Sequence, residues 1–434
     1  MKKIYFLTLA TLLSIVALKA QTLCTSGRYA NDTFTNFTTA SGVVYGSNVT
    51  VSASTLVLTM DIYQPAGDVE PNRPLIIWAH GGSFIGGTST DADVVKLSQS
   101  FAKKGYVCAS INYRLGFFPF DSVNVVKAVL RAIQDMKASI RFFYKDKLTS
   151  DTYKIDTNNI FIGGSSAGGV TALHTEYLNK SCEINPYIPQ ATLASLGGME
   201  GYSGNQCYSR KVKGVISLCG GLGNYGWLEA GDLPFCTMHG TIDGTVPYSR
   251  GKAISIIYFD GSRMLKEQAN VLGISNSFYT WYGKDHAPYI SSTLYMDTTI
   301  NFVRDYLISR LGCTDPPLLN QNSPAGTATL TAYTACTTNI VPSCSTIGID
   351  ENFQTTVSFD IFPNPSGSDV TISFENQNTT YKIEIFDLSG KLISSNSINK
   401  TEFLISKNEL NSGVYFVKVT TSSGNYSTKK LLFL

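Results

Sequence analysis

One pentapeptide constrains the fold of this chain more than any other feature. Gly164-Ser165-Ser166-Ala167-Gly168 lies between a β-branched, aromatic run at 159–162 and a stretch at 169–178 that is apolar at helical spacing. A serine at so sharp a strand-to-helix turn adopts a strained backbone that exposes its Oγ. Glycine is needed two residues before and two residues after it, because a Cβ there would collide with the neighbouring strand or helix. The pattern therefore predicts an exposed Ser166 hydroxyl at such a turn.

Around this turn the chain alternates between strand and helix patterns from Thr55 to about residue 311. The strands are nearly continuous apolar runs, as expected when helices cover both faces of a sheet. This order is typical of an α/β fold with a mostly parallel sheet and helices on both faces. We predict strands at 74–79, 106–113, 159–162, 213–219, 235–239 and 277–282, and helices at 91–104, 122–144, 249–270 and 293–311.

The pattern changes after Cys313. Residues 313–355 are rich in Thr, Ser, Asn and Pro and lack periodicity, which predicts a linker or a loose edge to the first domain. From 356 to 434, apolar and polar residues alternate in about seven short segments separated by turn residues. These segments predict a small C-terminal β-sandwich.

The N-terminus has the composition of a secretory signal peptide. Two lysines precede an apolar stretch from Ile4 to Leu18, and residues 17–20 have the small-x-small pattern that signal peptidase reads. We expect residues 1–20 to be removed after Ala20, because the stretch is shorter than the roughly 20 apolar residues of a membrane anchor. No other segment could span a bilayer. The net charge of +2 argues against nucleic acid as a partner.

Nine cysteines in an exported protein favour disulfides, and the odd number leaves at least one thiol unpaired. Cys108 and Cys219 lie in apolar strand-like runs, where buried free thiols are expected. No Cys or His pair has the spacing of metal ligands, so the sequence predicts neither a metal nor a cofactor. The preferred disulfides are Cys182–Cys207 and Cys336–Cys344.

A serine nucleophile needs a base, a carboxylate that orients the base, and donors for the developing oxyanion. The chain offers Ser166, then Asp243 in a loop after strand 235–239, then His286 in a loop after strand 277–282. Loops after parallel strands meet at one edge of the sheet, so these residues can converge there. Asp285 and Asp232 are the alternative acids.

Elimination among the four histidines favours His286 as the base. His80 belongs to a glycine loop, and His174 lies two turns down the helix after Ser166. His239 lies in the strand before the acid, where a structural role fits better. His286 alone follows the acid and lies in a loop after a strand.

The donors for the oxyanion come from a second glycine motif. His80-Gly81-Gly82-Ser83-Phe84 follows strand 74–79 directly, and its unhindered amides can point into the site. We expect the amides of Gly81 and Gly82 to form an oxyanion hole with the amide of Ala167, next to the nucleophile.

Four motifs carry a resemblance to a known family: Leu58–Pro65, His80–Phe84, Ile111–Gly116 and Ile155–Gly169. Residues 21–312 resemble the α/β-hydrolase superfamily, and within it the secreted esterases near the type-B carboxylesterases and the feruloyl- and acetyl-xylan-esterase-like group. The resemblance implies that Ser166, Asp243 and His286 are nucleophile, acid and base. It places Gly81, Gly82 and Ala167 at the oxyanion positions. Ser83 stands where many relatives carry a third glycine, so which amide of residues 81–83 points inward stays open.

A second resemblance covers residues 356–434, which are similar to type A sorting domains of the type IX secretion system of Bacteroidetes. It is carried by Phe362–Pro365, Ile385–Lys391, Leu410–Val417 and Lys429–Leu432. The resemblance implies contact with the type IX secretion machinery and a secreted or cell-surface protein. A carbohydrate-binding sandwich is the alternative, although no aromatic strip on one strand face is apparent.

The reaction that these resemblances imply is ester hydrolysis through an acyl-enzyme on Ser166, with short-chain or polysaccharide-linked acyl or feruloyl groups as substrates. Segment 183–210 either walls the acyl pocket as a partial lid or is a surface loop tethered by a disulfide, and Tyr225 and Trp227 are candidates for the same rim. The alternatives are a serine peptidase or polyester depolymerase of the same fold, and a catalytically silent binding protein.

Overall fold

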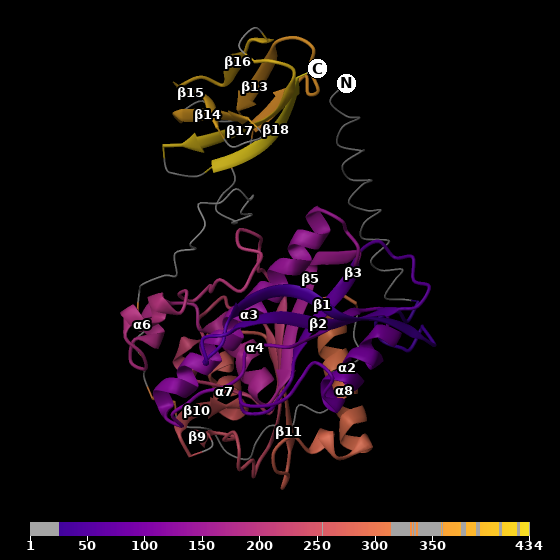
Figure 1. Ribbon diagram of the computed structural model, residues 1–434. Coiled ribbons are helices and arrows are strands. Elements are labelled where there is room, and N and C mark those ends of the chain that lie inside the picture. Colours follow the sequence, from indigo (N-terminus) through magenta and orange to yellow (C-terminus); the bar gives the residue numbers. More distant parts are fainter. Residues whose placement is uncertain are drawn as a thin grey trace. The chain divides into compact units, whose positions relative to one another are not determined.

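A computed structural model gives the fold and describes residues 26–253, 255–313, 330–331, 333, 336, 357, 359–374, 379–387, 391–407, 410–422 and 426–433. The predicted signal peptide at 1–20 and most of the predicted linker at 313–355 lie outside the described residues. The chain divides into two compact units, residues 1–343 and 344–434 (Figure 1).

An eight-stranded sheet in the order β1-β2-β4-β3-β5-β6-β8-β11 forms the centre of the first unit. β1 (Phe37–Val49) pairs antiparallel with β2 (Thr55–Pro65), which pairs antiparallel with β4. The other six strands run parallel, which confirms the predicted mostly parallel sheet. They are β3 (Arg73–Ala79), β4 (Val107–Ile111), β5 (Ile155–Ser165), β6 (Gly214–Leu218), β8 (Phe235–Gly240) and β11 (Asn276–Trp281).

Helices cover both faces of this sheet, as predicted. In Figure 1, α3 (Ser122–Leu148), α4 (Ala167–Tyr177) and α7 (Ser262–Leu272) lie on one side of the strands, and α2 (Ala92–Lys103) and α8 (Thr293–Arg310) lie on the other. Successive residues of β3 divide between the two cores. Leu75 and Ile77 pack in the core of α3, and Ile76 and Trp78 pack in the core of α2. Burial on both faces explains why these strands are continuous apolar runs.

The predicted helix at 249–270 is wrong in its first half. β9 (Arg250–Ala253) and β10 (Ile257–Gly261) form a small sheet with β7 (Gly221–Leu222), and α7 begins only at Ser262. In β10, Ile257 and Phe259 are buried whereas Tyr258 is 55% exposed. This period of two is a strand pattern, too short to stand out beside the helix that follows.

The predicted disulfides are also wrong. Cys182 is bonded to Cys336, a separation of 154 residues, and Cys207 and Cys313 are disulfide-bonded as well. Cysteine spacing alone cannot reveal a pair so distant along the chain. Cys108 and Cys219 are buried free thiols, as predicted, and Cys236 is a third.

Described residues of the 313–355 segment pack against the rest of the first unit. Besides Cys336, the Thr331 carbonyl oxygen accepts a hydrogen bond from the Tyr225 hydroxyl at 2.7 Å. The Tyr333 ring lies against Gly226, where a Cβ would be only 2.2 Å from the ring. At these positions the segment lies along the first unit.

The second unit consists of two antiparallel sheets around their own apolar core, as predicted for a small β-sandwich. Inward residues such as Ile372, Ile383 and Val417 are fully buried, and they alternate with polar neighbours. The first sheet contains β12 (Phe359–Phe362), β13 (Val370–Phe374) and β16 (Glu402–Ile405). The second contains β15 (Leu392–Ile398), β14 (Tyr381–Asp387), β17 (Gly413–Thr421) and β18 (Tyr426–Phe433).

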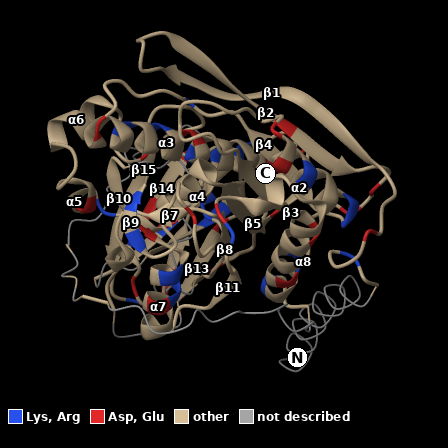
Figure 2. Cartoon of the chain, turned by 90° about the horizontal axis from the view of Figure 1, so that it is seen from below, with Lys and Arg blue, Asp and Glu red and all other residues tan. Residues whose placement is uncertain are grey.

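Charges are mixed rather than segregated. Figure 2 shows Lys and Arg residues interspersed with Asp and Glu residues, in keeping with the net charge of +2. Among the described residues, no helix combines the length and the apolar character that crossing a bilayer requires.

Candidate active site

Ser166 lies at the turn between β5 and α4, with a φ of 54° and a ψ of −115°. A positive φ is uncommon for a residue with a side chain, so its surroundings must hold it in place. A Cβ on Gly164 would lie 2.6 Å from the Ala79 carbonyl oxygen, and one on Gly168 would lie 2.0 Å from the same atom. The turn therefore requires glycine at both positions, as the sequence predicts.

Two further contacts anchor this turn. The Ser166 amide donates to the Leu218 carbonyl oxygen of β6 at 2.8 Å. The buried Ser165 hydroxyl lies 2.6 Å from the hydroxyl of Tyr289, in the short 3₁₀ helix Pro288–Ile290 that follows His286. Tyr289 thus links the serine turn to the loop of the predicted base. Tyr289 takes this role through a tertiary contact, so no pattern in the sequence around it predicts the role.

The three predicted residues of the catalytic triad lie together. His286 Nε2 is 2.7 Å from Ser166 Oγ, and His286 Nδ1 is 2.6 Å from Asp243 Oδ2. Because the ionised carboxylate can only accept, His286 Nδ1 donates to Asp243. In the neutral ring, Nε2 then accepts the hydrogen of the Ser166 hydroxyl. The Asp243 side chain is fully buried, whereas the His286 side chain is 19% exposed. The arrangement can pass a proton from the serine to a histidine held by a carboxylate.

The Asp243 carboxylate accepts hydrogen bonds on both oxygens. Oδ1 receives the amides of Thr245 at 2.9 Å and Val246 at 2.8 Å. Oδ2 faces His286 and also His239 Nε2, at 3.1 Å. Burial alone would raise the pKa of Asp243, but the two histidines outweigh it and hold the pKa well below its usual range.

The alternative acids lie elsewhere. Asp285 Oδ1 accepts the amides of Gly244 at 2.9 Å and His286 at 2.7 Å, so it joins the acid loop to the base loop. These backbone hydrogen bonds lower its pKa. Asp232 accepts the Glu229 amide at 2.7 Å. The carboxylate that contacts the His286 ring is that of Asp243.

The glycine loop lies beside the nucleophile. A Cβ on Gly81 would be 3.4 Å from the Ser166 Cβ, and Gly82, with a φ of 102°, begins a tight turn closed by the Gly86 amide. Within the described parts of the chain, the amides of Gly81, Gly82 and Ala167 have no acceptor. Ala167 is the first residue of α4, where helical amides lack an internal partner. These amides remain available to a ligand.

His80 and His174 support the site from inside the core. Burial lowers the pKa of His80, whose ring stacks on Tyr113 at 4.3 Å, and the Tyr113 hydroxyl donates to the His80 carbonyl oxygen at 2.8 Å. His174 Nε2 accepts the Gly223 amide at 3.1 Å, and burial lowers the pKa of His174 to about 4. Both rings are therefore neutral at pH 7.

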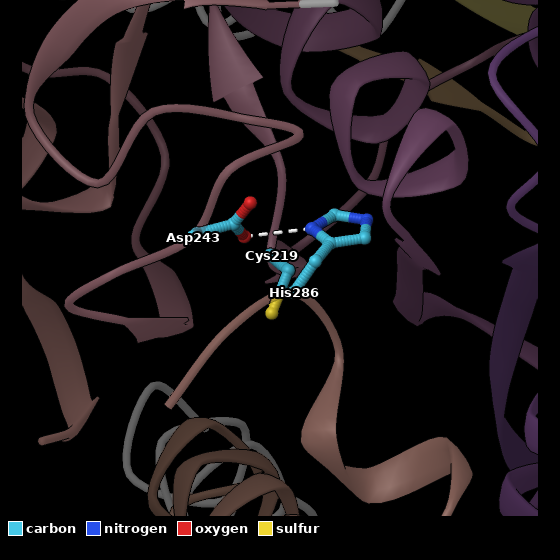
Figure 3. Close-up of side chains that lie close together, drawn as sticks. All are labelled: Cys219, Asp243 and His286. Atoms are coloured by element: carbon cyan, nitrogen blue, oxygen red, sulfur yellow. Dashed lines mark hydrogen bonds and ion pairs between the residues drawn. The ribbon is translucent and has the colours of Figure 1, made fainter. Parts of the chain in front are cut away.

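One group of side chains could in principle hold a metal ion. Within the described residues, ligand atoms of Cys219, Asp243 and His286 lie within 4.8 Å of one another. Figure 3 shows these three side chains close together. Burial raises the pKa of the Cys219 thiol far above its usual range, so the sulfur keeps its proton, whereas metal binding needs a thiolate. The other two groups bind each other. This geometry suits proton transfer better than metal binding.

Segment 183–210 is held against α3 by a buried ionic cluster. The Lys137 ammonium is 3.0 Å from Glu200 Oε1, and Arg141 is 3.1 Å from Glu200 Oε2. The Gln134 side chain donates to the carbonyl oxygens of Leu196 and Gly198. Of the two sequence alternatives, a tethered segment fits these contacts better than a lid.

Tyr225 and Trp227, the candidates for a substrate rim, are buried. Trp227 packs its ring edge-on against His174 at 5.7 Å. The Tyr225 amide donates to Asp260 at 2.8 Å. Both side chains belong to the core, and the expectation that they line the rim is wrong.

Two family models match the chain. The BD-FAE model matches residues 60–221, and the model of the secretion system C-terminal sorting domain matches residues 360–433. Residues 60–221 are thus similar to a BD-FAE domain, and residues 360–433 are similar to a sorting domain. The stretch matched by the BD-FAE model includes Ser166 and the glycine loop, whereas Asp243 and His286 lie beyond it.

Curated relatives match part of the chain. Carboxylesterase 3B of Mus musculus is 35% identical over 118 residues, which are 26% of this chain and 19% of the relative. Acetylcholinesterase 1 of Caenorhabditis briggsae is 30% identical over 160 residues, which are 36% of this chain and 24% of the relative. The chain thus spans only 19% to 24% of the length of these relatives.

Solved structures similar to the chain include two esterases. Esterase 2 of Thermogutta terrifontis, phosphorylated by paraoxon, is 19% identical, with a TM-score of 0.47, and covers 64% of this chain and 96% of its own. A truncated carbohydrate esterase from gut microbiota is 20% identical, with a TM-score of 0.44, and covers 65% of this chain and 99% of its own.

Proposed function

We propose that this protein is a secreted serine esterase that hydrolyses carboxylic esters through an acyl-enzyme on Ser166. The observation that carries the proposal is the continuous contact from Ser166 Oγ through His286 to the buried Asp243 carboxylate. Such a relay activates a hydroxyl that is otherwise a weak nucleophile. The esterase-like BD-FAE domain supports carboxylic esters as the substrate class.

In the first half of the reaction, His286 Nε2 takes the proton from Ser166 Oγ as that oxygen attacks the ester carbonyl carbon. Asp243 stabilises the imidazolium that forms. The amides of Ala167 and of Gly81 or Gly82 are the donors proposed for the oxyanion. His286 then gives its proton to the leaving alcohol, and the acyl group stays on Ser166.

In the second half, a water molecule takes the place of the alcohol. His286 removes a proton from it, the resulting hydroxide attacks the acyl carbon, and the acid leaves as the proton returns to Ser166 Oγ. The attachment of segment 183–210 to α3 favours short-chain or polysaccharide-linked acyl groups, since no lid for a long chain forms from it.

Hydrolysis of p-nitrophenyl esters from acetate to laurate tests this function, with methyl ferulate and acetylated xylan alongside. We expect the short esters to be cleaved, and Ser166→Ala to lower kcat by roughly three orders of magnitude or more while the protein stays folded. Retained hydrolysis in Ser166→Ala would overturn the mechanism. A folded wild type inactive on every ester would instead favour the peptidase or silent-binding alternatives.

The second part of the proposal concerns export. The sorting domain supports passage through a type IX secretion machinery, after removal of the signal peptide behind Ala20. We expect deletion of residues 344–434 to retain ester hydrolysis in the periplasm of a host that has this system. Full-length Ser166→Ala, the matched control, should still reach the surface or the medium. Export of the truncated chain at the wild-type level would contradict this part.

A further inference from the structure

His239 occupies an unusual place beside the acid. It is the penultimate residue of β8, its ring is fully buried, and both ring nitrogens have partners. Nδ1 lies 2.9 Å from the Ser262 hydroxyl, at the start of α7. Nε2 lies 3.0 Å from the Val246 carbonyl oxygen and 3.1 Å from Asp243 Oδ2. The ring therefore bridges α7 and the loop that carries the acid.

These partners require a hydrogen on Nε2 of His239. A carbonyl oxygen and an ionised carboxylate can only accept hydrogen bonds, so Nε2 must carry a hydrogen that it shares between them. A serine hydroxyl can both donate and accept, so Ser262 holds Nδ1 on the other side of the ring.

We propose that His239 is a positioning residue that holds the Asp243 carboxylate in the orientation needed by His286; this proposal rests on the esterase function proposed above. The shared N–H contacts both ends of the acid loop, at Asp243 and at Val246. The Val246 amide in turn donates to Asp243 Oδ1 at 2.8 Å. His239 thereby fixes both the backbone of the loop and Oδ2.

Removing this donor has a consequence for the base. Asp243 Oδ2 would be left with His286 as its remaining side-chain donor, so the carboxylate would become more basic and would hold the His286 proton more tightly. The ionisable groups that also face Asp243 and His239 are Asp285, Cys219, Tyr289 and Tyr248. They stay in place in the variants below, so differences between variants report on His239.

Two substitutions at position 239 separate positioning from packing. His239→Gln can keep an N–H near the place of Nε2, whereas His239→Leu removes it at similar volume. We expect His239→Leu to lower kcat about 10- to 100-fold, the factor that loss of one hydrogen bond to a charged group brings. KM should stay within about twofold, and the acid limb of the pH profile should move to higher pH. His239→Gln should recover at least part of kcat.

Two kinetic results would overturn the proposal. One is that His239→Leu keeps the wild-type kcat and pH profile, and the other is that His239→Gln and His239→Leu lower kcat equally. Nitrogen-15 NMR of the wild-type imidazoles is a test that does not depend on whether a variant folds. It should show His239 with hydrogen on Nε2, assigned by its proximity to Val246 and Ser262, and hydrogen on Nδ1 instead would refute the proposal. Ester hydrolysis by the wild type and its loss in Ser166→Ala report on the proposed function independently of His239.

Discussion

The strained backbone of Ser166 depends on the absence of two side chains. Gly168 lies so close to β3 that a Cβ would approach the Ala79 carbonyl oxygen to 2.0 Å and its carbon to 2.6 Å. Both atoms belong to the backbone of a central strand, which cannot move without disturbing the sheet. The glycines therefore preserve the position of the nucleophile as well as its conformation.

We predict that Gly168→Ala lowers the free energy of unfolding by roughly 3 kcal/mol, because α4 must move away from β3. Gly86→Ala is the control, since a Cβ there meets nothing within 4 Å and its φ is not positive. It should change the free energy by no more than about 0.5 kcal/mol. Guanidinium unfolding measures both, and equal effects would contradict the steric argument.

At this scale, the sequence predicts the residues whose chemistry is marked by a motif. Ser166 stands in a glycine-flanked turn, and Asp243 and His286 follow strands in the expected order. His239 and Tyr289 acquire their contacts only through strand register and loop closure. Because these contacts join residues from different elements, no local sequence pattern predicts them.

Helix α3 buries several charged side chains, Lys137 and Arg141 among them. Lys137 is fully buried, and burial lowers its pKa to about 8. Burial would raise the pKa of Glu200, but Lys137, Arg210 and Arg141 outweigh it and hold the pKa at about 2. The contribution of Glu200 to stability is therefore complete above about pH 4.5 and is lost as the pH falls toward 2.

Glu200→Gln should lower the free energy of unfolding by about 3 kcal/mol at pH 7, because it leaves the Lys137 ammonium buried without its counter-ion. Lys154→Gln is the matched control, as it breaks the exposed ion pair with Asp151, which is worth under about 1 kcal/mol. Urea unfolding at pH 7 compares them. If Glu200→Gln costs no more free energy of unfolding than Lys154→Gln, the buried ionic cluster does not hold segment 183–210 against α3.

Element types are predictable where burial makes a pattern strong and long. The parallel strands emerge because both sheet faces are covered, and the helices 91–104 and 122–144 emerge because they are amphipathic. β9 and β10 are missed because they are short and run directly into α7. β1 is missed because its Thr, Ser and Gly residues leave little apolar periodicity.

On the scale of the whole molecule, two units with different composition share one chain. The change from alternating strand and helix to short alternating strands predicts this division, and the two matched family models fall on either side of it. The Cys182–Cys336 disulfide ties part of the intervening segment to the first unit. Its pairing is settled by three-dimensional proximity alone, which the spacing of cysteines does not encode.

Covalent labelling with a fluorophosphonate, followed by peptide mass spectrometry, tests the central claim most directly. The reagent reacts with a serine only where a base activates the hydroxyl and donors stabilise the oxyanion. We predict one adduct per wild-type chain, on the peptide that contains Ser166, and no adduct in Ser166→Ala. An unlabelled wild type that is folded, or a label on any other residue, would contradict the account.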